Sequence, residues 1–252
     1  MGGALAQSIS RNSETKVYIY DKIQEKAAAL AEKCGGYSTD FDNLIASSDY
    51  IFLGVKPNVI EEVLGALKLS YKKRAVIVSM AAGIKIEKIE GVLQGNIPVI
   101  RIMPNTPVAV GAGLTAFSRG NATLESDVEG FKNLMSYTGA TEELPESDID
   151  AFCAIAGCGP AYAYMFIDAL AKGGEACGIP RDKALSYAAK MIHGAALMTL
   201  QSDDEPDTLC KNVCSPGGAT IEGVKVLSDA NFTNNVSDAI KAAYKRTLEL
   251  GK

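Results

Sequence analysis

Residues 209–227 read LCKNVCSPGGATIEGVKVL, and the rest of the chain is organised around them. A helical apolar pattern stops at Ser-Pro-Gly-Gly and resumes after Thr220, which predicts two helices that meet at a tight turn. The second helix is expected to begin near Gly218, and its first N–H groups, from Gly218, Ala219 and Thr220, lie on backbone with almost no side-chain bulk. A carboxylate or phosphate can approach such a helix start closely. The alternative is a plain corner between helices, with Ser215 or Thr220 as the N-cap.

The helical pattern continues through the second half of the chain. From about Asp148 onward there is no convincing strand pattern, and helical runs are predicted over residues 150–177, 181–200, 208–213, 220–227 and 232–250. A kink or break is expected at Gly157-Cys158-Gly159-Pro160, because proline cannot donate a hydrogen bond inside a helix. Many alanines in the long helices allow close helix approach. One chain alone would have trouble covering so much apolar helix, so the pattern favours an obligate dimer.

The first half of the chain alternates strands with helices. Strands are predicted over residues 16–21, 50–55, 75–79, 99–103, 114–118 and 140–144, with helices over residues 1–9, 23–33, 59–67, 85–93 and 125–137. Such alternation predicts the α/β class, with a doubly wound, mostly parallel sheet covered by helices on both faces. We expect a dinucleotide-binding domain over residues 1–146 and an all-helical substrate-binding and dimerisation domain over residues 147–252.

Small or polar residues follow the predicted strands, at the edge where such sheets bind ligands. These residues are Asp21, Lys56-Pro57, Ala81-Ala82-Gly83 and Pro104-Asn105. Only the tail of the fingerprint Gly-x-Gly-x-x-Gly is present: Gly2 can stand for its last glycine, and Asp21 follows at about the twenty-residue spacing expected of the ribose-binding acid. We therefore expect the chain to begin inside its own fingerprint, with the first, central strand absent and cofactor binding impaired.

Composition excludes several classes of protein. With 252 residues, 47% of them hydrophobic and 22% charged, the chain suits a soluble globule of one large or two modest domains. A net charge of −5 argues against nucleic acid as the main partner and favours small molecules. Uninterrupted apolar runs are strand-sized, so no membrane span is predicted. Six cysteines without a CxxC pair, and an amino end unlike a signal peptide, indicate a reducing, cytoplasmic compartment.

Three segments together resemble the Δ1-pyrroline-5-carboxylate reductase family, the enzymes of the last step of proline synthesis. They read VIRIMPNTP over residues 99–107, GCGPAY over residues 157–162 and NVCSPGGAT over residues 212–220. The resemblance covers essentially the whole chain apart from the amino end. It implies reduction of the imine of 1-pyrroline-5-carboxylate to L-proline by hydride from NADPH or NADH. It also implies helical domains that interlock as homodimers, which can assemble further.

The resemblance and the residue chemistry together give the expected site residues. The turn from Ser215 to Thr220 is expected to hold the substrate carboxylate through backbone N–H groups, while the Thr220 hydroxyl bonds to the ring nitrogen. The catalytic candidates are Thr220 and Ser215; the substrate-binding candidates are Asn212, Gly218, Ala219 and Glu146; the cofactor-binding candidates are Gly2, Asp21, Val55, Lys56, Ala82 and Asn105.

Several of these assignments have alternatives. Glu146 could be a solvated linker charge, and Lys56-Pro57 a plain turn. Asp21 favours NADH because an acid accepts from the ribose 2′-hydroxyl and repels a 2′-phosphate, whereas Lys22 beside it favours NADPH. No metal site is expected: Cys210 and Cys214 could share a helix face, but zinc needs about four ligands, and the only histidine, His193, is interpreted as structural.

Two other functions remain open. A hydroxyacid dehydrogenase of similar two-domain plan would want a lysine or histidine base near the start of the helical domain, and residues 152–169 contain neither. The other is a cofactor-impaired dimer without catalytic activity. Dinucleotide binding distinguishes that dimer from either enzyme.

Overall fold

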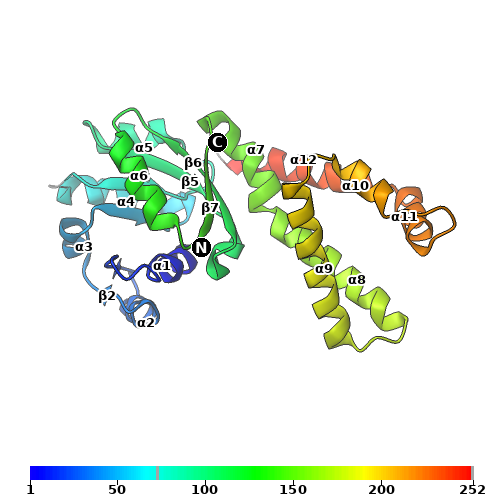
Figure 1. The fold of residues 1–252 in the computed structure, drawn as a ribbon. Coiled ribbons are helices and arrows are strands. Elements are labelled where there is room, and N and C mark those ends of the chain that lie inside the picture. The colour runs from blue at the N-terminus through cyan, green and yellow to red at the C-terminus, as the bar shows by residue number, and fades with distance from the viewer. Residues whose placement is uncertain (72–73, 251–252) are drawn as a thin grey trace. The chain divides into compact units, whose positions relative to one another are not determined.

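The structure is a computed structural model that describes residues 1–71 and 74–250 (Figure 1). It divides into two compact units. The first unit runs from Met1 to Cys158 and also takes in the chain from Ala243 onward, and the second unit is Gly159–Ala242. This division falls later than the domain boundary predicted after Glu146, and the end of the last helix belongs with the first unit rather than the second.

The first unit contains a five-stranded sheet in the order β3-β4-β5-β6-β7. Neighbouring strands are parallel except for β5 and β6, so the prediction of a mostly parallel sheet is confirmed. A separate two-stranded sheet pairs β1 with β2 in parallel. The strands are β1 (Tyr18–Ile19), β2 (Tyr37–Ser38), β3 (Tyr50–Leu53), β4 (Val76–Ser79), β5 (Val99–Met103), β6 (Gly113–Arg119) and β7 (Gly139–Glu143).

Helices cover both faces of the larger sheet because its strands alternate their side chains between two cores. On β4, Ile77 packs in one cluster with residues of α4 and α5, while Val76 and Val78 pack in another with residues of α1 and α6. All four residues of β4 are buried, as in a strand that is covered on both sides. The helices of this unit are α1 (Gly2–Ile9), α2 (Gln24–Cys34), α3 (Phe41–Ser47), α4 (Ile60–Ser70), α5 (Ile86–Leu93) and α6 (Glu125–Met135), with 3-10 turns η1 (Pro57–Val59), η2 (Thr106–Val110) and η3 (Glu146–Asp148).

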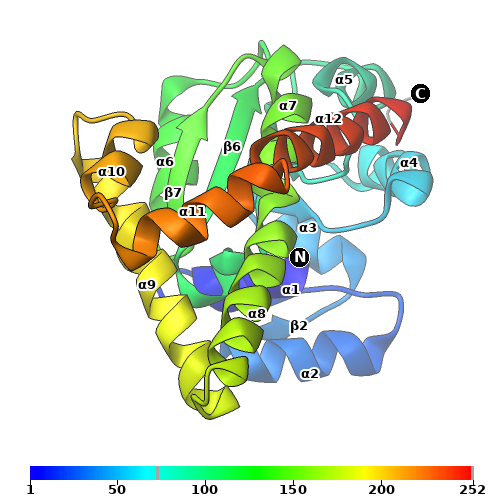
Figure 2. The same ribbon diagram turned by 90° about the vertical axis from the view of Figure 1, so that its right-hand side faces the viewer.

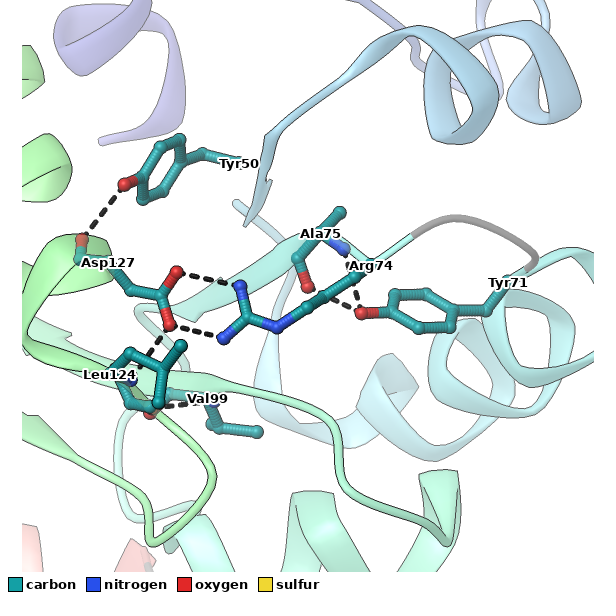
Figure 3. A network of polar contacts seen from close by, with 8 residues as sticks. Tyr50, Tyr71, Arg74, Ala75, Val99, Leu124 and Asp127 are labelled. Carbon is teal, nitrogen blue, oxygen red and sulfur yellow. Dashed lines mark hydrogen bonds and ion pairs between the residues drawn. The ribbon is translucent and has the colours of Figure 1, made fainter.

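A polar network fixes the start of α6 beside the starts of the strands (Figure 3). Arg74 donates to both carboxylate oxygens of Asp127, at 2.8 and 2.6 Å. The same carboxylate accepts from the N–H of Leu124, the N-cap of α6, and the hydroxyl of Tyr50 donates to the Asp127 carbonyl. These bonds join the starts of β3 and β4 to the start of α6, at the end of the sheet where these strands begin.

Helices make up the second unit and the segment that leads into it, as predicted. The segment consists of α7 (Ile149–Phe152) and a π-helical turn at Cys153–Gly157; the kink or break expected at residues 157–160 takes the form of this irregular turn, and the helix continues beyond it. The later helices are α8 (Gly159–Ala176), α9 (Arg181–Gln201), α10 (Pro206–Asn212), α11 (Ala219–Asp229) and α12 (Phe232–Leu250). Helices α8 and α9 lie side by side (Figure 2).

The second unit covers little of its own apolar surface. Among its hydrophobic residues only Ala171, Ala184 and Ala188 are buried within the described part of the chain. Large side chains such as Met165 (72% exposed) and Leu200 (83% exposed) have no cover. A dimer was expected because one chain alone would leave such apolar helix surface uncovered, and the second unit has this surface.

One helical run, Glu146–Ala176, is long and apolar enough to cross a membrane by length and composition alone. The short apolar runs of the sequence did not indicate a helix of this length, and the absence of a membrane span stays a prediction. The sequence did not predict this continuous run because Gly157 and Pro160 were expected to kink or break the helix. The π-helical turn instead lets the helix continue past them. A helix that packs its apolar face on another protein chain has the same length and hydropathy.

Candidate functional site

The start of α1 lies against the end of β3 in the first unit. A Cβ atom added at Gly2 would lie 3.5 Å from the Cα of Gly54, so the two backbones approach closely. The N–H groups of Ala4 and Leu5 bond to the Met1 carbonyl, and no side chain caps the turn before them. Free N–H groups at a helix start, with a glycine backbone beside them, suit a phosphate group. The residues present therefore fit the pyrophosphate of a dinucleotide.

Further candidate residues follow β1 of the two-stranded sheet and β3 of the five-stranded sheet. Asp21 accepts from the N–H of Ile23 at 2.9 Å and is exposed. Lys22 is not a free cation: its Nζ lies 2.7 Å from Glu62 Oε1, and this hydrogen bond raises the pKa of Lys22. Lys56 is exposed as the N-cap of η1, so the turn predicted after β3 is present.

Asn105 is held by the protein through both ends of its side-chain amide. Its Nδ2 donates to the Ala156 carbonyl at 3.1 Å, and its Oδ1 accepts from the N–H of Leu114 at 3.0 Å. The residue is only 9% exposed. Ala82, on the neighbouring loop, is half-buried and packs on the cluster of Met103, Ala116 and Ile149. These two hydrogen bonds fix the loop that contains Asn105.

Glu146 is bound to the first unit rather than solvated, so the alternative of a solvated linker charge is wrong. Its Oε1 accepts from Arg101 at 3.2 Å and from the N–H of Ile86 at 2.8 Å. Sequence reasoning missed Arg101, which also donates to Asp150 at 2.8 Å. The available signal was a single charge within the otherwise apolar strand Val99–Met103.

The predicted substrate turn lies in the second unit. Helix α11 has Gly218 as its N-cap with no side-chain cap, so the alternative in which Ser215 or Thr220 caps this helix is wrong. The Gly218 N–H bonds to the Ser215 carbonyl at 3.0 Å, and Gly217 has a φ of +69°, which favours glycine. The side chains of Asn212, Ser215 and Thr220 are exposed. The start of α11 therefore leaves N–H groups free for an anion.

Two thiols lie next to this turn. Reduced contact with water raises the pKa of Cys214, and the neighbouring Cys210 raises it further. Within the described residues, no group of three or more His, Cys, Asp or Glu side chains is placed to hold a metal ion.

These features define a dinucleotide-binding fold followed by a helical unit, and the chain matches known proteins in both parts. Residues 1–83 match a family described as NADP oxidoreductase, coenzyme F420-dependent. Residues 146–250 match a family described as pyrroline-5-carboxylate reductase dimerisation.

Relatives with the same name cover most of the chain. A pyrroline-5-carboxylate reductase of Escherichia coli is 33% identical over 94% of this chain and 88% of its own length, and one of Glycine max is 39% identical over 83% and 76%. Pyrroline-5-carboxylate reductase 2 of Rattus norvegicus is 42% identical, but the match spans only 65% of its length. The chain belongs to the pyrroline-5-carboxylate reductase family.

A solved structure has the same fold over the full chain. The pyrroline carboxylate reductase of Plasmodium falciparum, with NADP bound, has a TM-score of 0.89 and 28% identity, and the match covers 100% of this chain and 95% of that one. This confirms the predicted family and the α/β fold with a helical second part.

Proposed function

We propose that this chain reduces the imine of 1-pyrroline-5-carboxylate to L-proline with hydride from NADPH or NADH. The observation that carries the proposal is the uncapped start of α11 at Gly218, within the sequence Asn212–Thr220. A cyclic imine that carries a carboxylate needs an anion site beside a hydrogen-bond partner for its ring nitrogen. Relatives named pyrroline-5-carboxylate reductase support the same reaction.

On this proposal the start of α11 binds the substrate carboxylate. Its N–H groups at Gly218, Ala219 and Thr220 carry partial positive charge at the helix N-terminus. The Thr220 hydroxyl bonds to the ring nitrogen and stabilises its protonated form, while Ser215 and Asn212 orient the turn. A site without histidine suits this reaction, because no side chain has to act as a strong base.

The first unit holds the cofactor on this proposal. The start of α1 at Gly2 binds the pyrophosphate, and Asp21 binds the ribose. The loops that contain Val55, Lys56 and Ala82 contact the nicotinamide half. Asn105 supports the nicotinamide side by fixing its loop. When bound, the cofactor supplies the hydride. Because Glu62 already neutralises Lys22, Asp21 is expected to dominate and to favour NADH slightly.

A second copy of this chain is the proposed partner. The exposed apolar surface of the second unit and the match to a dimerisation family over residues 146–250 support a homodimer. Six free cysteines support a reducing, cytoplasmic location.

The test is oxidation of NADPH and of NADH when 1-pyrroline-5-carboxylate is added, with L-proline measured as the product. We expect oxidation of one cofactor matched by an equal amount of proline. A folded chain that binds a dinucleotide but forms no proline would favour the hydroxyacid dehydrogenase, and a folded chain that binds no dinucleotide would favour the cofactor-impaired dimer. Light scattering on the same sample tests the dimer, and a monomer at working concentration would contradict it.

A further inference from the structure

Strand β5 and Asn105, in the loop that follows this strand, hold one helical segment of the first unit, residues 146–157. Arg101 Nη1 lies 3.2 Å from Glu146 Oε1, and Nη2 lies 2.8 Å from Asp150 Oδ1. Further along the chain, Asn105 Nδ2 donates to the Ala156 carbonyl at 3.1 Å. The segment is therefore held at its start, in α7 and in the π-helical turn.

Arg101 is buried to a degree that is unusual for arginine. Its side chain is 1% exposed, against 27% for Glu146 and 16% for Asp150, and its Nε has no hydrogen-bond partner within the described part of the chain. Replacing buried ion pairs with packed apolar residues is often neutral or stabilising. Fold stability alone therefore does not account for a charge at this position. A requirement that residues 146–157 be held in one fixed position does account for it.

Glu146 joins a third element to this cluster. Its Oε1 also accepts from the N–H of Ile86, the first residue of α5, at 2.8 Å. Helix α5 follows the loop that contains Ala82, and β5 leads into the loop that contains Asn105. The Arg101–Glu146 pair thus links both loops proposed to face the nicotinamide with the segment from which the chain continues into the second unit.

We infer that Arg101 is a positioning residue for the imine reduction, acting through Glu146 and Asp150 rather than on the reacting atoms. This inference rests on the proposed function. Glu146, predicted as a substrate-side acid, takes the same positioning role because its Oε1 already has two donors. Loss of Arg101 should lower the turnover number and leave dinucleotide affinity nearly unchanged, because Gly2 and Asp21 belong to other elements.

The experiment compares Arg101→Met and Arg101→Lys with the wild-type chain. Arg119→Met is the matched control, since Arg119 on the neighbouring β6 also pairs with two carboxylates, Glu125 and Glu143, but is 29% exposed. We would measure kcat, KM for 1-pyrroline-5-carboxylate and the Kd of NADPH by fluorescence titration. Arg101→Met should lower kcat about tenfold or more, with the Kd within about twofold, because small errors in positioning strongly reduce the rate. Arg101→Lys should recover part of kcat, and Arg119→Met should stay within about twofold of wild type.

The outcomes separate this inference from the proposed function. A kcat within about twofold of wild type in Arg101→Met, or a fall no larger than that in Arg119→Met, overturns the inference and leaves the reductase standing. A wild-type chain that binds NADPH but forms no proline overturns the proposed function and the inference with it. If Arg101→Met does not fold, Asp150→Asn decides: lower kcat with unchanged NADPH affinity supports the inference, and unchanged kcat overturns it.

Discussion

The side-chain amide of Asn105 donates a hydrogen bond of 3.1 Å to the main-chain carbonyl of Ala156. Pro160 stands four residues after Ala156, where a regular helix would supply an N–H to that carbonyl, and proline has none. Asn105 therefore supplies a donor at a place where the helix lacks one. The bond joins the motif VIRIMPNTP to the residue immediately before the motif GCGPAY.

Replacing Asn105 should destabilise the first unit. Asn105→Leu removes the partners of the Ala156 carbonyl and of the Leu114 N–H, and unpaired buried groups cost about 1–3 kcal/mol each. We expect a lower urea midpoint by far-UV circular dichroism. Asn133→Asp on the exposed face of α6 is the control and should unfold as wild type does. Equal midpoints for Asn105→Leu and the control would show that these bonds do not hold the loop.

The hydroxyl of Thr220 should matter for turnover. Thr220→Ala is expected to lower kcat about tenfold or more, because one transition-state hydrogen bond is lost. Thr208→Ala serves as the control, since Thr208 is an exposed threonine on α10 in the same unit. Steady-state kinetics with 1-pyrroline-5-carboxylate measures both variants. Unchanged kcat in Thr220→Ala would remove the hydroxyl from the mechanism.

The pair of Lys22 and Glu62 should set part of the cofactor preference. Glu62→Gln frees the Lys22 ammonium to meet a 2′-phosphate, so the KM for NADPH should fall about two- to fivefold while that for NADH stays the same. Glu61→Gln, which breaks the adjacent exposed pair with Lys88, should change neither value. An identical effect on NADH and NADPH would contradict a role for Lys22 at the 2′ position.

Asp127 should make the fold sensitive to acid. The hydrogen bonds from Arg74 lower the pKa of Asp127 against the opposing effect of burial, and the Leu124 N–H lowers it further. The folded chain thus holds this proton less tightly than the unfolded chain does. The resulting stabilisation is present at neutral pH and is lost as pH falls from about 4 through the lower folded value.

Asp127→Asn tests this dependence. It should cost about 1–2 kcal/mol at pH 7, from a lost cap and a lost ion pair, and the difference from wild type should shrink in acid. Urea midpoints measured across pH check the trend, with Asp148→Asn as an exposed control in the same unit. A difference from wild type that is the same at all pH values would exclude the carboxyl group as its cause.

The sequence predicted the large elements of this fold because their apolar periodicity is strong. It missed β2 and α3 for a local reason: Tyr37–Ser38 is a two-residue exposed strand, too short to show alternation. The start of α3 did carry a signal, since Asp40 caps it by accepting from the N–H of Asn43. Short elements of this kind are recognised by their caps rather than by their periodicity.

The part of the candidate site that could be predicted is the part formed by the backbone of a single sequence motif. The turn before α11 followed from Ser-Pro-Gly-Gly, and the structure confirms the helix start at Gly218. The buried Arg101 could not be predicted in the same way, because its partners Glu146 and Asp150 lie far along the chain. Nothing in the local sequence brings these charges together.

The most direct test of the central claim is transfer of deuterium into L-proline from NADH or NADPH that carries two deuterium atoms at C4. The chain, 1-pyrroline-5-carboxylate and the deuterated cofactor are incubated together, and proline is analysed by mass spectrometry. We predict proline that carries one deuterium, at the former imine carbon, in an amount equal to the cofactor oxidised. Proline without deuterium, or cofactor oxidation without proline, would contradict hydride transfer to the imine.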